Sequence, residues 1–330
     1  MTDPADGAGP AELPSAGVAP RRFGVDVGGT KLRTALGAAD GTILAERVEP
    51  TVRDSAGGLI ERIVEALDHL RAEAAAATDD QPIGAAGIAL PVAVDPVTGQ
   101  LDSFHNLPGL AGAVHLRADL EVALGMPVAI DNDANAAALA ERAHGAARGV
   151  DDVVVIAIGT GIGLGIIAGG SLVRGVRGMA GEIGFLPLGS ADPTRTPDGA
   201  TPAYEALVAG PGLRRRIDAA VQADPATRLS IGATLGDTVA IAAGGDPTAM
   251  ALVDEEAHLI ALGIAAVVAL VDPELVLLSG GVGSVAGLLE PVRRHVSELV
   301  RVAPRIETGL LGERGPLVGA LELARLASRG

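Results

Sequence analysis

The chain has 330 residues, of which 48% are hydrophobic, with a formal net charge of −16 and a pI of about 4.7. This length and apolar content suit one large or two medium globular domains. The acidity argues against nucleic acid as a partner, because binding a phosphate backbone needs clustered basic side chains. No cysteine is present, which excludes disulfides and any zinc site with thiolate ligands.

Two segments bear on where the protein works. Residues 1–21 are acidic and rich in Pro, Gly and Ala, without the positively charged start and apolar centre of a signal peptide. We expect them to form a disordered tail. The longest apolar run, residues 259–271, is too short to span a bilayer, so a buried core helix is predicted there. A cytoplasmic protein without a membrane partner is therefore expected.

Strands and helices alternate along the first half of the chain. Residues 22–37 are expected to form a strand, a Gly/Thr turn and a second strand. Apolar residues at helical spacing predict an amphipathic helix at 58–77. Further strands are expected in "IGAAGIALPVAVD" and "MPVAIDND", and a helix follows that stops at Gly145.

The same theme begins again at residue 151. Residues 151–173 repeat the strand, Gly/Thr turn and strand of the first half. Later elements are expected as a core helix at 246–271, a strand in "ELVLLSGG", and helices at 284–300 and 316–328. Two halves that begin with the same strand–turn–strand pattern predict a duplicated α/β fold with a cleft between the copies.

The duplication also predicts the domains. We place an N-terminal α/β domain at 22–131, with the helix 316–328 packing on it, and a larger C-terminal α/β domain at 132–315. Ligands of open α/β sheets bind beyond the carboxyl ends of the strands, so the turns at 26–31 and 159–163 should face the cleft.

Neither Gly/Thr turn is a familiar nucleotide loop. "GVDVGGTK" has Thr before Lys and leads into a strand, unlike a Walker A loop, and "GTGIGLG" lacks the Rossmann glycine spacing. What remains is a hairpin whose glycines let backbone N–H groups approach an anion, with a hydroxyl donated by Thr30. Asp26 ends the first strand, where it can hold Mg²⁺ directly or through a water molecule. A plain Gly-rich turn is the alternative, which two such hairpins in matched halves disfavour.

Two junctions between a strand and a helix carry further polar or flexible residues. In "LVLLSGGVGS", Gly280 and Gly281 offer backbone that can lie flat against an adenine or a ribose. In "AIDNDANAAALAE", helix capping, worth about 1 kcal/mol, accounts for one of Asp131 and Asp133 but not for both. A carboxylate here can accept the proton of an attacking hydroxyl, as phosphoryl transfer requires, and Asn132 suits a polyol.

Five motifs now occur in a fixed order: "DVGGTK", "DNDANAAALAE", "GTGIGLGII", "GMAGEIG" and "LLSGGVG". Together they resemble the ROK family of bacterial sugar kinases and sugar-responsive repressors, from about residue 22 to the C-terminus. The resemblance implies the actin-like, hexokinase-like ATPase fold. It further implies a transferase of carbohydrate metabolism that uses ATP and Mg²⁺ to phosphorylate the primary hydroxyl (CH₂OH) of a glucose-like hexose or hexose-like ring. A homodimer is the expected assembly.

The resemblance also implies roles for individual residues. Asp133 resembles the catalytic base of the family. The residues expected to bind sugar hydroxyls are Asn106, Asn132, Glu182 and Glu205. The residues expected to bind the nucleotide are Asp26, Gly28, Gly29, Thr30, Lys31, Gly159, Thr160 and Gly161 at the phosphates, and Gly280, Gly281 and Val282 beside the nucleoside.

One position departs from the family pattern. Phe185 stands where most kinases of the family carry a histidine that ligates zinc and touches the sugar near its C1 and C2 hydroxyls, and no Cys-rich loop follows. No zinc site is therefore expected, and a phenyl ring cannot replace the lost hydrogen bond. One alternative is a zinc-free glucokinase, and another is a kinase of a different hexose. The third is a kinase whose substrate is altered at the C1/C2 end: a valiolone-type C7-cyclitol or an amino sugar such as kanosamine, both used in antibiotic pathways.

Two non-enzymatic alternatives are disfavoured by the sequence. Repressors of the family place a winged-helix DNA reader before the first strand, and the 21 or so residues found here are too few and not basic. A non-catalytic sugar-binding relative is disfavoured because Asp133 and both glycine hairpins are present.

Overall fold

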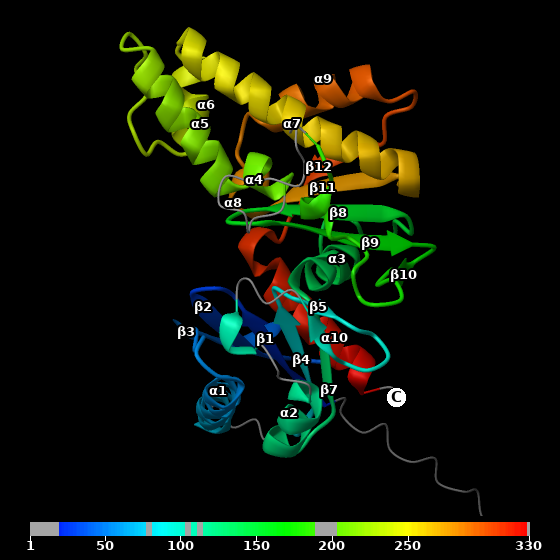
Figure 1. The fold of residues 1–330 in the computed structure, drawn as a ribbon. Coiled ribbons are helices and arrows are strands. Elements are labelled where there is room, and N and C mark those ends of the chain that lie inside the picture. Colours follow the sequence, from blue (N-terminus) through cyan, green and yellow to red (C-terminus); the bar gives the residue numbers. More distant parts are fainter. Residues whose placement is uncertain (1–19, 77–80, 103–106, 111–114, 189–202, 329–330) are drawn as a thin grey trace, which may run out of the picture.

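A computed structural model describes residues 20–76, 81–102, 107–110, 115–188 and 203–328. Within these residues the chain forms two mixed five-stranded sheets, flanked by helices, and one two-stranded ribbon (Figure 1). Among the described helices, none is both long and apolar enough to cross a membrane.

The first sheet has the order β3-β2-β1-β4-β7. Its strands are β1 (Arg21–Val27), β2 (Lys31–Gly37), β3 (Ile43–Pro50), β4 (Ile83–Leu90) and β7 (Val128–Asn132). β1, β2 and β3 are antiparallel neighbours, whereas β1, β4 and β7 run parallel. The other elements of this half are α1 (Ala56–Ala76), α2 (Leu116–Leu124), the short helix η2 (Pro108–Leu110) and the ribbon of β5 (Ala93–Val94) and β6 (Leu101–Asp102).

Side chains along β1 point alternately to the two faces of this sheet. Phe23, Val25 and Val27 are buried in one cluster with the apolar residues of α1 and α2. Gly24 lies on the opposite face, where an added Cβ would meet the side chain of Leu321 at 2.9 Å. Asp26 has the same parity as Gly24, so its side chain belongs to the face that looks toward the second half of the chain.

The second sheet repeats this topology in the order β10-β9-β8-β11-β12. Its strands are β8 (Val153–Ile158), β9 (Ile162–Ala168), β10 (Ser171–Leu172), β11 (Leu275–Ser279) and β12 (Arg305–Thr308). Again three antiparallel strands are extended by two parallel ones. The predicted duplication of an α/β unit is confirmed, whereas the exact domain boundaries at 131 and 315 remain a prediction.

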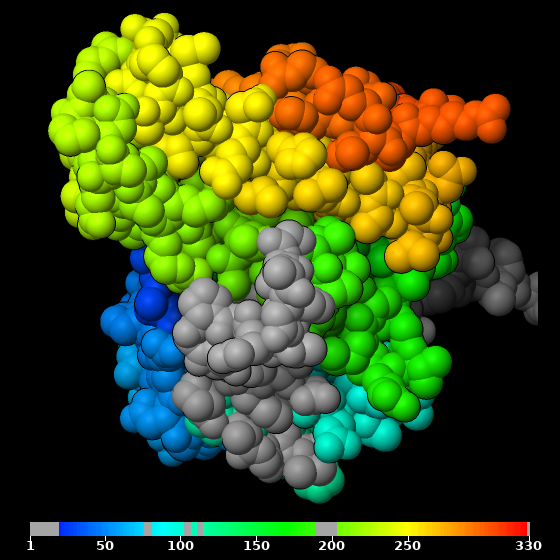
Figure 2. Space-filling view, turned by 45° about the horizontal axis from the view of Figure 1, so that its top comes forward, coloured from blue at the N-terminus to red at the C-terminus, as the bar shows by residue number. Residues whose placement is uncertain are grey.

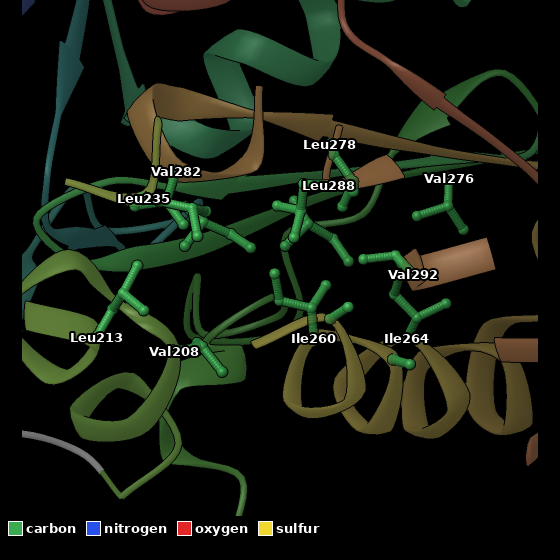
Figure 3. Close-up of a cluster of buried hydrophobic side chains, with 14 of the residues drawn as sticks. Val208, Leu213, Leu235, Ile260, Ile264, Val276, Leu278, Val282, Leu288 and Val292 are labelled. Atoms are coloured by element: carbon green, nitrogen blue, oxygen red, sulfur yellow. The ribbon is translucent and has the colours of Figure 1, made fainter. Parts of the chain in front are cut away.

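The outer face of the second sheet is covered by α5 (Gly210–Ala223), α6 (Leu235–Ala243), α7 (Pro247–Val271) and α9 (Leu289–Leu299), which gather at the end of the molecule away from the first half (Figures 1 and 2). The shorter helices of this half are η3 (Ile183–Phe185), α4 (Glu205–Val208), α8 (Gly280–Gly283) and η4 (Gly312–Arg314). Of these, η4 contacts the first sheet through ion pairs from Glu313 and Arg314. The core helix predicted at 246–271 is α7. Its Ile260 and Ile264 pack toward Val276 and Leu278 of β11 and Val292 of α9 (Figure 3).

Two helices, α3 (Asp133–His144) and α10 (Gly315–Ala327), lie between the sheets (Figure 1). They cross so closely that a Cβ on Gly319 would lie 1.9 Å from the carbonyl oxygen of Ala136. The first sheet contacts α10 equally closely, since a Cβ on Gly87 of β4 would lie 1.9 Å from the carbonyl oxygen of Ala320. The second sheet contacts α3, since a Cβ on Gly165 of β9 would lie 2.3 Å from the carbonyl oxygen of Ala134. Small residues therefore let both sheets and both helices meet backbone to backbone.

Candidate active site

The junction between β7 and α3 holds the three polar residues of the "DND" motif. Asn132 is the N-cap of α3, since its side-chain oxygen accepts hydrogen bonds from the backbone N–H groups of Ala134 at 2.8 Å and Asn135 at 3.3 Å. Its amide nitrogen donates to the carbonyl of Val92 at 3.3 Å. The alternative in which Asp131 or Asp133 caps the helix is therefore wrong, and both carboxylates have other partners.

Asp131 is buried in a network that the sequence did not assign. Its Oδ1 accepts from the backbone N–H of Asn132 and from Nδ2 of Asn135, both at 2.8 Å. Its Oδ2 accepts from Nε of Arg174 at 2.6 Å. Because Arg174 follows β10 of the second sheet, this ion pair ties the last strand of the first sheet to the other half. The i, i+4 spacing of Asp131 and Asn135 was the available signal, but nothing local pointed to Arg174.

Asp133 is the first residue of α3 and is only partly exposed. Burial raises the pKa of this carboxyl from its ordinary value of 3.8 to about 6, despite a hydrogen bond accepted from the N–H of Ala134. The pKa of Asp26 is raised to about 7, first by burial and then by the negative charge of Asp133, with Arg33 opposing. The predicted base and the predicted metal-binding carboxylate, 107 positions apart in the chain, thus lie close enough to interact.

Arg33 reaches this pair because Asp26 and Arg33 are directly opposite each other in the β1–β2 register. Opposed residues of antiparallel strands project from the same face of the sheet. Arg33 also forms an ion pair with Glu313 of η4 at 2.8 Å. The positive charge beside Asp26 was not predicted, although the spacing of the two residues about a tight turn would have allowed it.

Asp26 and Asp133 are suited to a Mg²⁺ ion that is also bound by water and phosphate, and not to a metal ion bound by protein side chains alone. No group of three or more His, Cys, Asp or Glu side chains in the described part of the chain is arranged to hold a metal ion. Mg²⁺ keeps several waters and is usually bound by one or two carboxylates together with substrate phosphates. A nearby cation also favours the charged forms of these two half-buried carboxyls, whose pKa values are raised.

The first glycine hairpin is closed by backbone hydrogen bonds. The N–H of Gly28 donates to the carbonyl of Lys31 at 2.9 Å, and the hydroxyl of Thr51 donates to the carbonyl of Gly28 at 2.8 Å. Thr30 and Lys31 are exposed, and a Cβ on Gly29 would have open space around it. The turn therefore presents accessible backbone and polar side chains at the carboxyl end of β1.

The second hairpin contacts one of the predicted sugar-binding residues. Gly159 N–H donates to the carbonyl of Gly161 at 2.9 Å, and Thr160 is exposed. Glu205, at the start of α4, accepts a hydrogen bond from the N–H of Ile162 through Oε2 at 3.0 Å. The start of α3 also approaches this hairpin, since a Cβ on Gly163 would lie 2.8 Å from that of Ala134.

The β11–α8 turn lies beside the same hairpin. Gly280 has a φ of 79°, and a Cβ there would lie 2.4 Å from the carbonyl oxygen of Ile158, so only glycine fits. Gly281 faces open space. The side chain of Val282 is buried in the core of the second half, which leaves only its backbone for the predicted nucleoside contact.

The remaining predicted residues lie at the 174–186 segment or outside the described chain. Glu182 directly precedes η3, and the N–H of Phe185 donates to its carbonyl at 3.2 Å. The Phe185 residue is 52% exposed, unusually open for a phenyl ring. Asn106 lies outside the described residues, so its expected contact with the sugar stays a prediction.

Comparisons with known proteins agree with the motifs. The model of the ROK family matches residues 22–326. A glucokinase from Halalkalibacterium halodurans is 32% identical over 249 residues, which cover 73% of this chain and 74% of that protein. An N-acetylmannosamine kinase from Shigella boydii is 34% identical over 247 residues, 74% of this chain and 77% of that protein.

A solved relative extends the similarity to three dimensions. A ROK family glucokinase from Streptomyces griseus, crystallised in complex with glucose and AMPPNP, is 30% identical to this chain. Its structure aligns with a TM-score of 0.71 over 93% of this chain and 99% of its own. The predicted actin-like ATPase fold is thereby confirmed. From the family model, the curated relatives and the shared fold together, the chain belongs to the ROK family.

Proposed function

We propose that this chain is an ATP- and Mg²⁺-dependent kinase that phosphorylates the primary hydroxyl of a hexose-like ring. The observation that carries the proposal is the convergence of Asp26 and Asp133, each from the end of a different strand, beside a glycine hairpin from each half. Its relatives are kinases of glucose and of N-acetylmannosamine, which supports a sugar as the acceptor.

Asp133 acts as the general base in this proposal. Its carboxylate accepts the proton of the acceptor hydroxyl as the oxygen attacks, and the raised pKa of about 6 makes it a stronger base than an ordinary aspartate. When bound, Mg-ATP supplies the phosphoryl group and the metal offsets the charge that develops during transfer. Asp26 would hold the metal, while the hairpins at 28–31 and 159–161 would bind phosphate oxygens through backbone N–H groups and threonine hydroxyls.

The acceptor ring would be held mainly by hydrogen bonds. Asn132 lies at the start of α3, and Glu205 lies beside the second hairpin. Glu182 and Asn106 would complete the group of residues that bind the ring. Asn132 keeps donor capacity for a ring hydroxyl, because its amide nitrogen has two hydrogens and one described partner.

The exposed ring of Phe185 favours a second candidate substrate. A phenyl group cannot donate or accept a hydrogen bond near the C1 and C2 positions, so discrimination in favour of glucose should be weak there. A C7-cyclitol or an amino sugar altered at that end fits this environment as well as glucose does, and the absence of cysteine fits a zinc-free site.

A coupled ATPase assay across glucose, N-acetylmannosamine, kanosamine and a valiolone-type cyclitol tests the proposal. ADP release should depend on one of these acceptors. Phe185→His should raise kcat/KM for glucose at least tenfold relative to the best cyclitol or amino sugar. Phe185→Leu, which adds no hydrogen-bond donor, is the control and should leave that ratio unchanged. If no acceptor stimulates ADP release, the proposed function is wrong.

The pH profile provides a separate prediction. We expect kcat/KM to fall as pH is lowered through about 7 and then 6, because Asp26 and Asp133 must both be ionised. The contribution of these two carboxyls to folding stability should have the opposite dependence on pH. Because both pKa values are raised in the folded state, this contribution is complete below about pH 4 and is lost as pH rises to about 7. Carboxyls such as Asp246, whose pKa is lowered by hydrogen bonds from the backbone N–H groups of Arg228 and Ala249, act in the other direction, so the test is the difference in urea midpoint between Asp133→Asn and the wild type from pH 4 to 9. A wild-type activity unchanged from pH 8 to 5 would contradict the assignment.

A further inference from the structure

Glu205 contacts two parts of the site that the proposed function keeps separate. The residue is assigned to the acceptor ring, yet its carboxylate lies against the hairpin assigned to phosphates. Oε2 accepts the hydrogen bond from the N–H of Ile162 at 3.0 Å. The same oxygen would lie 2.7 Å from a Cβ placed on Gly161, with Cδ at 3.5 Å. Gly161 is thus the residue whose lack of a side chain lets the carboxylate approach the turn.

The backbone that follows Glu205 holds the same turn from a second position. The N–H of Gly210, the first residue of α5, donates to the carbonyl of Gly159 at 2.8 Å. The N–H of Ala209 donates to the carbonyl of Glu205 at 3.0 Å, which fixes the short α4 segment between the two contacts. Residues 205–210 and the hairpin therefore form one connected backbone unit.

That unit is anchored to the core of the second half. Tyr204, immediately before Glu205, is buried, and its hydroxyl donates to the carbonyl of Leu259 in α7 at 2.9 Å. Gly263, one turn along α7, would bring a Cβ within 2.2 Å of the same hydroxyl oxygen, so the tyrosine fits only because the helix has a glycine there. The hairpin is the more exposed of the two partners, since Thr160 is exposed and a Cβ added to Gly159 would meet nothing within 4 Å.

From these contacts we infer that Glu205 is a positioning residue that couples acceptor binding to the geometry of the 159–161 hairpin. The inference rests on the proposed function. A ring hydroxyl bound to Glu205 shares the carboxylate with the N–H of Ile162, and so it changes the position or strength of the bond that orients the turn. Acceptor and nucleotide should then strengthen each other's binding, and by linkage the two factors must be equal.

Two glycines of one hairpin provide a matched test. In Gly161→Ala the new methyl group collides with the Glu205 carboxylate, whereas in Gly159→Ala it meets nothing within 4 Å. Neither glycine has a positive φ, so alanine strains neither backbone. Both methyl groups lie in the proposed phosphate turn, so weaker nucleotide binding is expected in both variants. Only Gly161→Ala should also lose the coupling.

The measurement is the affinity for Mg-AMPPNP by isothermal titration calorimetry, with and without a saturating concentration of the acceptor that has the highest kcat/KM in the assay above. In the wild-type chain the acceptor should tighten AMPPNP binding at least fivefold, and AMPPNP should tighten acceptor binding by the same factor. Gly159→Ala should retain this factor, while Gly161→Ala and Glu205→Ala should reduce it to between one and two. Glu205→Gln, which keeps an oxygen for the Ile162 N–H, should give an intermediate factor. Thermal unfolding would check that each variant is folded.

The outcomes separate this inference from the function on which it rests. A coupling factor of one in an active wild-type chain, equal losses in both glycine variants, or full coupling in Gly161→Ala would overturn the role of Glu205 and leave the kinase assignment intact. A chain that binds AMPPNP but phosphorylates no acceptor would contradict the proposed function, and the inference would fall with it.

Discussion

Asp133→Asn should give a folded protein whose turnover is at least 10²-fold lower than that of the wild type. Asparagine can still accept the hydrogen bond from Ala134, so the start of α3 should be preserved. It cannot take a proton from the acceptor hydroxyl. Because the wild-type carboxyl has its pKa raised to about 6, its charge is unfavourable in the folded state at pH 8. The variant should therefore be more stable at that pH, by about 1 to 3 kcal/mol.

Asp131→Asn is the matched control, two positions away and isosteric in the same way. Its carboxylate is buried and fully engaged with Asn132, Asn135 and Arg174. Removing the charge breaks the ion pair and leaves Arg174 without this partner, so we expect a loss of about 1 to 3 kcal/mol. Steady-state kinetics and urea unfolding at pH 8 separate the two residues by the sign of the stability change. Wild-type turnover in Asp133→Asn would show that the base has been misassigned.

Gly319→Ala should destabilise the protein strongly, by about 3 kcal/mol or more. Its Cβ would lie 1.9 Å from the carbonyl oxygen of Ala136, and backbone at a helix crossing cannot move aside as a flexible side chain can. Gly57→Ala in the first turn of α1 is the control, since its Cβ would meet nothing within 4 Å. There the better helix propensity of alanine should stabilise the protein by up to about 1 kcal/mol. Equal urea midpoints for the two variants would mean that α3 and α10 do not pack as closely as described.

The general plan of the fold could be predicted because it follows from local patterns of apolar and turn-forming residues. Strands such as β8 and β11 are nearly continuous apolar runs, and each glycine hairpin links two strands of one half. Local patterns were less reliable where helices begin. The helix expected at 284–300 begins as α9 at Leu289, after the separate turn α8 at Gly280–Gly283. In the "DND" motif, three residues that can all cap a helix follow one another, and tertiary partners decide which of them does.

The sequence indicates candidate residues for the site but not the contacts among them. Asp26, Asp133 and Glu205 were expected in binding or catalysis on the strength of motifs. What could not be read from the sequence is that Arg174 holds Asp131 or that Glu205 lies against the second hairpin. Each of these contacts joins segments that only the packing of sheets and helices brings together.

The crossing of α3 and α10 has a mechanical consequence. Glycine and alanine make the closest contacts, and Ala89, Ala136 and Ala320 share a small cluster with Leu323, against which Leu139 packs. Because the two backbones meet at one point through small residues, we expect the helices to rotate about that point more readily than they slide past each other. Asp133 is the first residue of α3, three positions before Ala136 at the contact. We expect any relative rotation of the two sheets to move the outer helices much further than the carboxylate of Asp133, the proposed base.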